Sequence, residues 1–205
     1  HDAVTLTNGG LLAGNVDLGG GVNSLSVTSG LLALVLDQDV GIRGAGDLSF
    51  TSGSRIDTGL NRVLGDESFV LASDVTSYNG DPTILNPFKP ISFAISENGD
   101  EILLTSTRDG DYYAQRSPNG SLGSALDRMA AAAVQSALSA GGSDLILTLD
   151  RSDTPGSDSA QLQPHAIGGL GLSQVRQASS MHRALQNQNS TTWPDLGVAC
   201  RRQRN

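Results

Sequence analysis

Few side chains in this sequence are of the types that catalyse reactions, and the best-spaced of them are two aspartates and an arginine. Asp37 and Asp39 are two residues apart and could share one face of a strand, with Arg43 close by. Paired carboxylates can divide the work of a general acid and a general base, as they do in enzymes that cleave polysaccharides. The alternative is two turn aspartates after an apolar segment. This second interpretation is favoured, because a hydrolase site would need further catalytic side chains. Residues 1–80 contain no lysine and no histidine apart from His1.

A Ser-His-Asp triad has no better support. His165 follows a proline in a Gly-rich segment, and His182 lies on a predicted helical stripe, so a structural or exposed role is favoured for both. No Gly-x-Ser-x-Gly motif precedes a predicted helix. We therefore predict that the chain has no catalytic residue and is not an enzyme.

A glycine-rich turn at 19–25 is similar to the calcium-binding nonapeptide of repeat toxins, Gly-Gly-x-Gly-x-Asp-x-apolar. Val22 stands in place of the third glycine and Ser24 in place of the aspartate. The motif also occurs once, whereas calcium needs tandem turns that supply oxygens from both sides. The segment therefore predicts a tight turn with positive φ, and we expect no metal and no other cofactor.

The predicted strands, which would position any such site, follow a sequence repeat of about 22 residues. A phrase of alternating apolar and polar residues, followed by Thr, then Asn or Ser, then Gly, begins at Val4, Leu25 and Leu48, and a degenerate fourth copy begins at Phe69. Apolar residues two apart lie on one face of a strand. The intervening residues leave room for further short strands but not for an ordinary helix. The pattern predicts an all-β fold, a right-handed parallel β-helix of about five coils, because so short a repeat must stack to bury its apolar face.

Past the fourth copy the pattern changes to one that would close the β-helix. Strands are predicted at 91–95 and 101–105, and the intervening Asn98-Gly99 suits a tight hairpin. Three prolines before the hairpin predict an irregular loop, because proline cannot donate to a ladder. They are Pro82, Pro87 and Pro90. Loop and hairpin together are predicted to cap the solenoid.

Helical segments follow the hairpin. An apolar stripe over 122–137 predicts a helix with Ser121 as its N-cap and Gly141 at its end. A linker is predicted at 153–158 and a second helix at about 170–186, and the residues from 187 onward are expected to be loosely ordered. The predicted divisions are 1–80 for the coils, 81–116 for the capping loop and hairpin, 117–150 for the helical segment, and 151–205 for the linker and helical tail.

Charge and composition exclude several classes of function. The net charge is −8 and the acidic residues are scattered, which argues against nucleic-acid binding. The basic cluster at 201–204 is expected to be a frayed end, and the lone Cys200 allows no internal disulfide. No apolar stretch approaches the length of a membrane helix. The chain begins at His1 without an initiator Met, so we expect it to be a piece of a longer protein.

The order of features resembles the end of a bacterial autotransporter passenger. The resemblance is carried by the Gly-rich coil at 16–25, the segments 65–71 and 98–105, and the helical residues 125–128, and the stretch 167–185 is similar to the family's segment before the barrel. In that family a β-helical passenger is followed by an autochaperone-like segment and then by an outer-membrane β-barrel. The resemblance implies a non-catalytic segment that caps the β-helix and promotes its folding and export.

The resemblance also implies partners and a location. The partners would be the chain's own C-terminal barrel and the passenger coils upstream, and the location would be the cell surface, the outer membrane or the medium, reached through the periplasm. The strongest alternative is an adhesin-type β-helix that binds a host or cell-surface ligand, since solenoids present long flat faces. No aromatic stripe supports a ligand face, because Tyr78, Tyr112 and Tyr113 lie near predicted loops.

Overall fold

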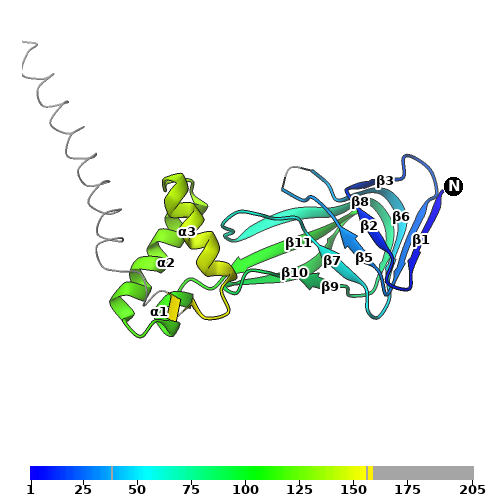
Figure 1. The fold of residues 1–205 in the computed structure, drawn as a ribbon. Coiled ribbons are helices and arrows are strands. Elements are labelled where there is room, and N and C mark those ends of the chain that lie inside the picture. The colour runs from blue at the N-terminus through cyan, green and yellow to red at the C-terminus, as the bar shows by residue number, and fades with distance from the viewer. Residues whose placement is uncertain (38, 156, 159–205) are drawn as a thin grey trace, which may run out of the picture. The chain divides into compact units, whose positions relative to one another are not determined.

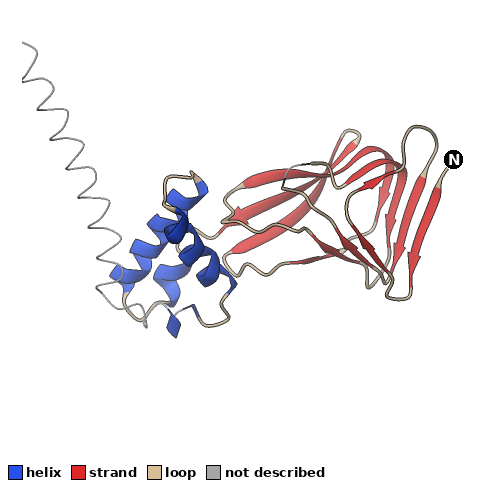
Figure 2. Ribbon diagram, turned by 45° about the horizontal axis from the view of Figure 1, so that its top comes forward, coloured by secondary structure: helices blue, strands red, loops and turns tan. Residues whose placement is uncertain are grey.

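The structure is a computed structural model that describes residues 1–37, 39–155 and 157–158, and it consists of short strands followed by helices (Figure 1). The strands are β1 (Ala3–Thr7), β2 (Leu11–Ala13), β3 (Val16–Asp17), β4 (Ser24–Thr28), β5 (Leu31–Ala33), β6 (Ile42–Phe50), β7 (Arg55–Asp57), β8 (Glu67–Asn79), β9 (Thr83–Leu85), β10 (Ile91–Asn98) and β11 (Glu101–Arg108). The helices are α1 (Tyr112–Arg116), α2 (Gly120–Val134) and α3 (Ala140–Arg151). Figure 2 shows the strands in red and the helices in blue.

The strands wind into a parallel β-solenoid of about three turns. One sheet stacks β1, β4, β6 and β8 in parallel, and the other stacks β2, β5, β7 and β9 in parallel. Each turn of the chain therefore adds one strand to each sheet, and the predicted parallel β-helix is confirmed. The predicted number of about five coils is wrong, because the pairing changes from parallel to antiparallel after β8.

The predicted register of the repeat is correct for three copies and wrong for the fourth. Val4 stands opposite Leu25, and Leu25 stands opposite Leu48. The residue opposite Leu48 is Tyr78, whereas Phe69 pairs with the hairpin strand β11. The chain between β6 and the matching part of β8 is longer than in the earlier coils, and the β6–β8 ladder also contains two irregularities, between Arg43 and Gly46 and between Gly46 and Asp47.

Aliphatic side chains between the two sheets form the core. Leu25 and Val27 of β4 and Leu32 of β5 are fully buried, and Leu48 and Ile56 continue the same layer in the next coil. The residues between them in sequence point outward, as strand geometry requires. Stacked aliphatic side chains fill this narrow interior without many large rings, which agrees with the low aromatic content of 4%.

Strand β8 joins two kinds of ladder. Its first part pairs antiparallel with β11, its second part pairs parallel with β6, and Ala72 stands opposite both Ile42 and Ile102. Strand β10 completes an antiparallel hairpin with β11 through the two-residue loop Gly99-Asp100. Gly99 has a φ of 66°, the positive value that a tight hairpin with glycine at this position needs. The predicted hairpin is confirmed.

The predicted irregular loop before the hairpin contains regular structure. Strand β9 follows Pro82 directly and pairs with β7, so the prediction of an irregular loop is wrong over this strand. Proline is tolerated at that point because it precedes the ladder and no ladder bond is lost. After β9, the Asn86 side chain donates to the carbonyl of Ile91 and accepts from the amide of Phe88, which fixes the approach to β10.

The helices differ in their ends from those predicted. The N-cap of α2 is Asn119, whose Oδ1 accepts from the amides of Ser121 and Leu122, so the prediction of Ser121 as N-cap is wrong. Helix α2 ends at Val134, and Gly141 lies in the first turn of α3, so the predicted end is also wrong. Within the described residues no helix has the length and hydrophobicity needed to cross a membrane. The predicted helix at 170–186 and the tail beyond it lie outside the described residues, as do His165, His182, Cys200 and the cluster 201–204.

Candidate functional site

The first coil of the solenoid, formed by β1, β2 and β3, has an uncovered edge, and we call it the open first coil. Within the described part of the chain, β1 pairs only with β4 and β2 only with β5. Val4, Leu6 and Leu12 point into the core yet remain half-buried, whereas their register partners Leu25, Val27 and Leu32 are all fully buried. We call the stack of these inward-facing side chains the inner column. At its uncovered end, apolar side chains and the unpaired backbone groups of β1 and β2 lie together, and stacking of another coil requires both.

Exposed apolar side chains flank this edge. Leu11 is 62% exposed and Val22 is 69% exposed, and both belong to the first coil or its connection to the second. Uncovered strand edges that carry apolar residues are prone to pair with further strands. The open first coil is consequently the part of the described chain best suited to bind more β-structure.

The glycine-rich turn at 19–24 is organised around a buried asparagine. The Asn23 side chain is 2% exposed; its Nδ2 lies 3.0 Å from the carbonyl oxygens of Leu18 and Gly44, and its Oδ1 accepts from the amide of Asp2. The Asn23 side chain thus forms hydrogen bonds with backbone groups of successive coils, which would otherwise be buried without partners. Sequence reasoning identified the turn but missed this role.

Two glycines on the neighbouring strand explain why the chain can pass so close to this turn. Gly44 and Gly46 both have positive φ, 66° and 58°. A Cβ on Gly44 would lie 2.1 Å from the carbonyl oxygen of Gly19, and a Cβ on Gly46 would lie 2.6 Å from that of Asn23. Both the backbone conformation and the space therefore require glycine. Positive φ at Gly19 confirms the predicted tight turn.

Asp37 and Asp39, the two carboxylates spaced so that they could share a strand face, are held by different arginines. Arg43 forms an ion pair with Asp39, and this arginine together with the Val40 amide holds the pKa of the Asp39 carboxyl below its ordinary value. Asp37 instead accepts from Nε of Arg62 at 2.6 Å. The Arg43–Asp39 contact is local to one turn, whereas the Arg62–Asp37 contact joins residues 25 positions apart in the chain. These separate contacts do not assemble an acid–base pair.

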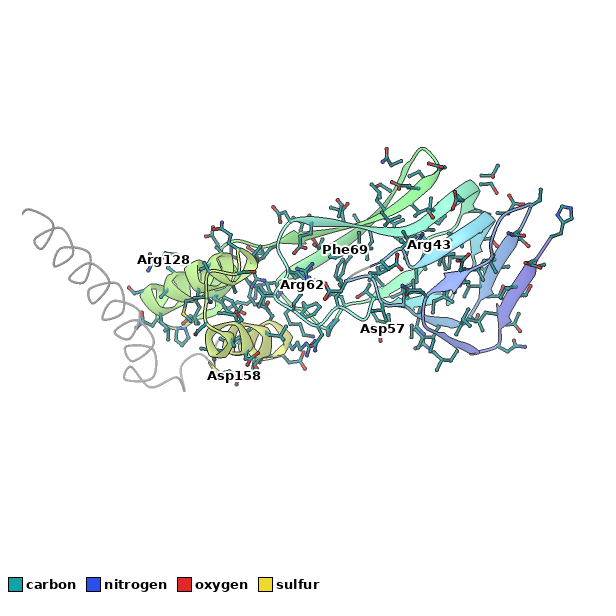
Figure 3. The ribbon with its side chains drawn as sticks, turned by 90° about the horizontal axis from the view of Figure 1, so that it is seen from above. Arg43, Asp57, Arg62, Phe69, Arg128 and Asp158 are labelled. Atoms are coloured by element: carbon teal, nitrogen blue, oxygen red, sulfur yellow. The ribbon has the colours of Figure 1, made fainter. Side chains whose placement is uncertain are left out.

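Arg62 is the centre of a second network (Figure 3). Its guanidinium donates to both carboxylate oxygens of Glu67, at 2.8 and 2.6 Å, and lies 5.7 Å from the centre of the Phe69 ring. The bonds from Arg62 lower the pKa of Glu67, against the opposing effect of burial. The network fixes the start of β8, where the pairing becomes antiparallel.

A buried ion pair joins the hairpin to the helices. Arg108 at the end of β11 donates to both carboxylate oxygens of Asp150 in α3, at 3.0 and 2.6 Å. Asp150 is fully buried and also accepts from the Tyr113 hydroxyl, and burial followed by the charge of Asp150 raises the pKa of Tyr113. We call these three residues the hairpin–helix lock. Sequence reasoning missed it, because partners about 40 residues apart leave no local signal.

The same region is held by contacts of α3 with the connection between β9 and β10, and by contacts between α1 and α2. The Lys89 amide donates to the Asp150 carbonyl at 2.6 Å, and the guanidinium of Arg151 lies 5.1 Å from the centre of the Phe88 ring. Asp127 of α2 accepts from the amides of Tyr113 and Ala114 in α1.

In the described part of the chain no group of three or more His, Cys, Asp and Glu side chains could hold a metal ion.

Comparisons with known proteins add no family to this description. No family model, no curated protein and no solved structure matches the chain. The class of protein is therefore defined by the fold alone, as a parallel β-solenoid whose parallel series is followed by an antiparallel hairpin and helices.

Proposed function

We propose that this chain is the closing segment of a β-helical passenger of the autotransporter kind, with a structural and secretory role and no catalytic one. The observation that carries the proposal is the contrast along the inner column of the solenoid. Leu12 is half-buried, whereas Leu32, its partner in the next coil, is fully buried. A column of this kind is completed by another coil of the same architecture.

The proposed mechanism is templated stacking. Strands of a preceding coil would pair with the free edges of β1 and β2 and would cover Val4, Leu6 and Leu12. Each fully buried aliphatic side chain contributes on the order of 1 to 3 kcal/mol, and each added coil presents the next edge. Folding from this segment would thus favour movement of the rest of the chain outward through the membrane.

In this proposal the partners are the preceding coils and a C-terminal outer-membrane β-barrel, and the place of action is the cell surface. The hairpin β10–β11 and the hairpin–helix lock would keep the closing end folded while the other end accepts coils. The antiparallel pairing of β8 with β11 supports this division, because it ends the parallel series at one side only.

The proposal is tested by a substitution on the open first coil. Leu6→Glu should prevent stacking, since a charge would enter the interface with the preceding coil, while the isolated chain loses little stability because Leu6 is only half-buried. The measurement is the protease resistance and surface display of the preceding passenger when it is fused to this segment. Thr5→Glu is the matched control, because Thr5 lies next to Leu6 in β1 but is exposed and points outward.

A second variant separates folding from stacking. Deletion of 91–108, which removes the hairpin, should leave the preceding passenger sensitive to protease or unsecreted. Normal export and normal resistance in both Leu6→Glu and the deletion would refute the proposal. Binding of the purified chain to cell surfaces, unchanged by Leu6→Glu, would instead support the adhesin function.

A further inference from the structure

A groove of about 520 Å³ with apolar and acidic lining lies beside the hairpin, and we call it the β9–β10 groove. It is lined by residues in and around β9 and by three residues of β10: Asp81, Pro82, Ile84, Asn86, Phe93, Ala94 and Ile95. Within the described residues β9 pairs only with β7, and β10 only with β11. Each of the two strands therefore has one edge without a strand partner.

The way in which β10 contributes to the groove shows that its backbone edge is accessible. Side chains alternate between the two faces of a strand, yet the consecutive residues Phe93, Ala94 and Ile95 all line the groove. Such a lining arises when the edge of the strand borders the groove. Phe93 and Ile95, together with Ile84 across the groove, are half-buried and offer apolar surface beside that edge.

Three polar side chains in and around β8, β9 and β10 have no ion-pair or hydrogen-bond partner among the described residues. Asp81 and Glu97 are exposed and form no ion pair with any described residue. The Tyr78 hydroxyl oxygen is buried and has no hydrogen-bond partner among the described residues. Glu97 lies two residues after Ile95 in β10 and therefore shares the face of that strand that carries Phe93 and Ile95. Burial, followed by the charges of Asp81 and Glu97, raises the pKa of Tyr78 to about 12.

We propose that the β9–β10 groove binds a basic partner polypeptide in extended conformation, which adds a strand to the free edge of β10. Main-chain hydrogen bonds would supply affinity, and alternate apolar side chains would pack on Phe93, Ile95 and Ile84. Lysine or arginine side chains would face Asp81 and Glu97. The net charge of −8 disfavours a second copy of this chain as the occupant and favours a basic one. The inference goes beyond the proposed function and concerns a different edge of the molecule.

The test uses the full chain and a synthetic peptide of about seven residues, the common length of a strand, that alternates lysine and valine. Binding is measured by fluorescence anisotropy, and its place by hydrogen exchange of the amides of β10. We expect saturable binding, protection of β10 amides, and weaker binding at high salt. A peptide of the same composition with its lysines and valines in separate blocks should bind weakly, because its apolar side chains do not share one face.

Substitutions link the binding to the acidic groups. Asp81→Asn combined with Glu97→Gln should weaken binding about fivefold, the scale expected for two exposed charge pairs. The matched control is Asp144→Asn combined with Glu101→Gln, which removes the same charge from α3 and β11. The proposal is overturned if the alternating peptide does not bind, if the two double variants weaken it equally, or if protection appears on strands other than β9 and β10.

Discussion

Similar aliphatic side chains are half-buried at one end of the solenoid and fully buried near the other. At the open first coil, Leu6 and Leu12 face the core but are half-buried. At the hairpin end, Ile102 and Leu104 of β11 are 2% and 0% exposed. The difference lies in the neighbours of each layer: the first coil has none on its outer side among the described residues, whereas β11 lies between β8 and β10. The first coil is thus an uncovered layer among the described residues, whereas β11 is an inner strand of its sheet.

The largest effect is expected at the hairpin end, in the hairpin–helix lock. Asp150→Ala should lower the free energy of unfolding by about 3 to 5 kcal/mol, because it leaves the guanidinium of Arg108 in a nearly buried position without its partner. Chemical denaturation measures the loss. Asp144→Asn on the same helix is the control and should change stability by less than about 0.5 kcal/mol. Equal stability of the two variants would show that the lock does not hold the helices to the hairpin.

A pair of register-matched substitutions compares the layers directly. Leu32→Ala should cost about 3 kcal/mol, since it empties a fully buried position, and Leu12→Ala should cost less than half as much because Leu12 is half-buried. Denaturant titration of the isolated chain gives both values. Fusion to a preceding coil should raise the cost of Leu12→Ala toward that of Leu32→Ala. A cost that stays low in the fusion would mean that no coil stacks there.

A glycine substitution tests the close approach between the first two coils. Gly44→Ala should destabilise the chain by about 1 to 3 kcal/mol, because it places an alanine at positive φ and its Cβ against the Gly19 carbonyl. Gly20→Ala is the control, since no atom lies within 4 Å of a Cβ at that position. Thermal melting of both variants provides the measurement. Equal melting temperatures would show that this approach is relaxed in solution.

The smallest effect concerns pH and the network around Arg62. The pKa of Glu67 is lowered in the folded state, so its contribution to stability is present above its ordinary pKa of 4.5 and is lost as the pH falls through the folded value. Glu67→Gln should therefore reduce stability at pH 7 by about 1 kcal/mol or less and flatten its dependence on pH below 4.5. Glu101→Gln is the control. Identical pH profiles for wild type and Glu67→Gln would contradict the pairing with Arg62.

The sequence predicted the fold where neighbouring coils share one pattern. Val4, Leu25 and Leu48 could be aligned because the same alternation precedes the same turn in each coil. Phe69 was misplaced because its segment repeats the apolar alternation that begins at Leu48, whereas in the structure Phe69 pairs with β11 and Tyr78 stands opposite Leu48. The lock residues Arg108 and Asp150 could not be paired, since their contact depends on how the helices pack and on no local pattern.

Predictions of sites were limited in the same way. The turn in the segment 19–25 was correctly predicted from its glycines, whereas the role of Asn23 depends on a carbonyl group brought near it by the next coil. Asp37 and Asp39 are close in sequence, yet Arg62 and Arg43 separate them into different contacts. The β9–β10 groove is formed by two strand edges, and an edge is defined only once every pairing is known.

The double pairing of Ala72 in β8, with Ile42 on one side and Ile102 on the other, has a mechanical consequence. Tension applied to the N-terminus would peel the first coil without disturbing β8, because only the later strands β6 and β11 hold it. The chain from Val4 to Leu25 would then extend by about 70 Å in a single step. Force spectroscopy should accordingly record successive rips from the parallel coils before the final rupture of β8 from its two neighbours.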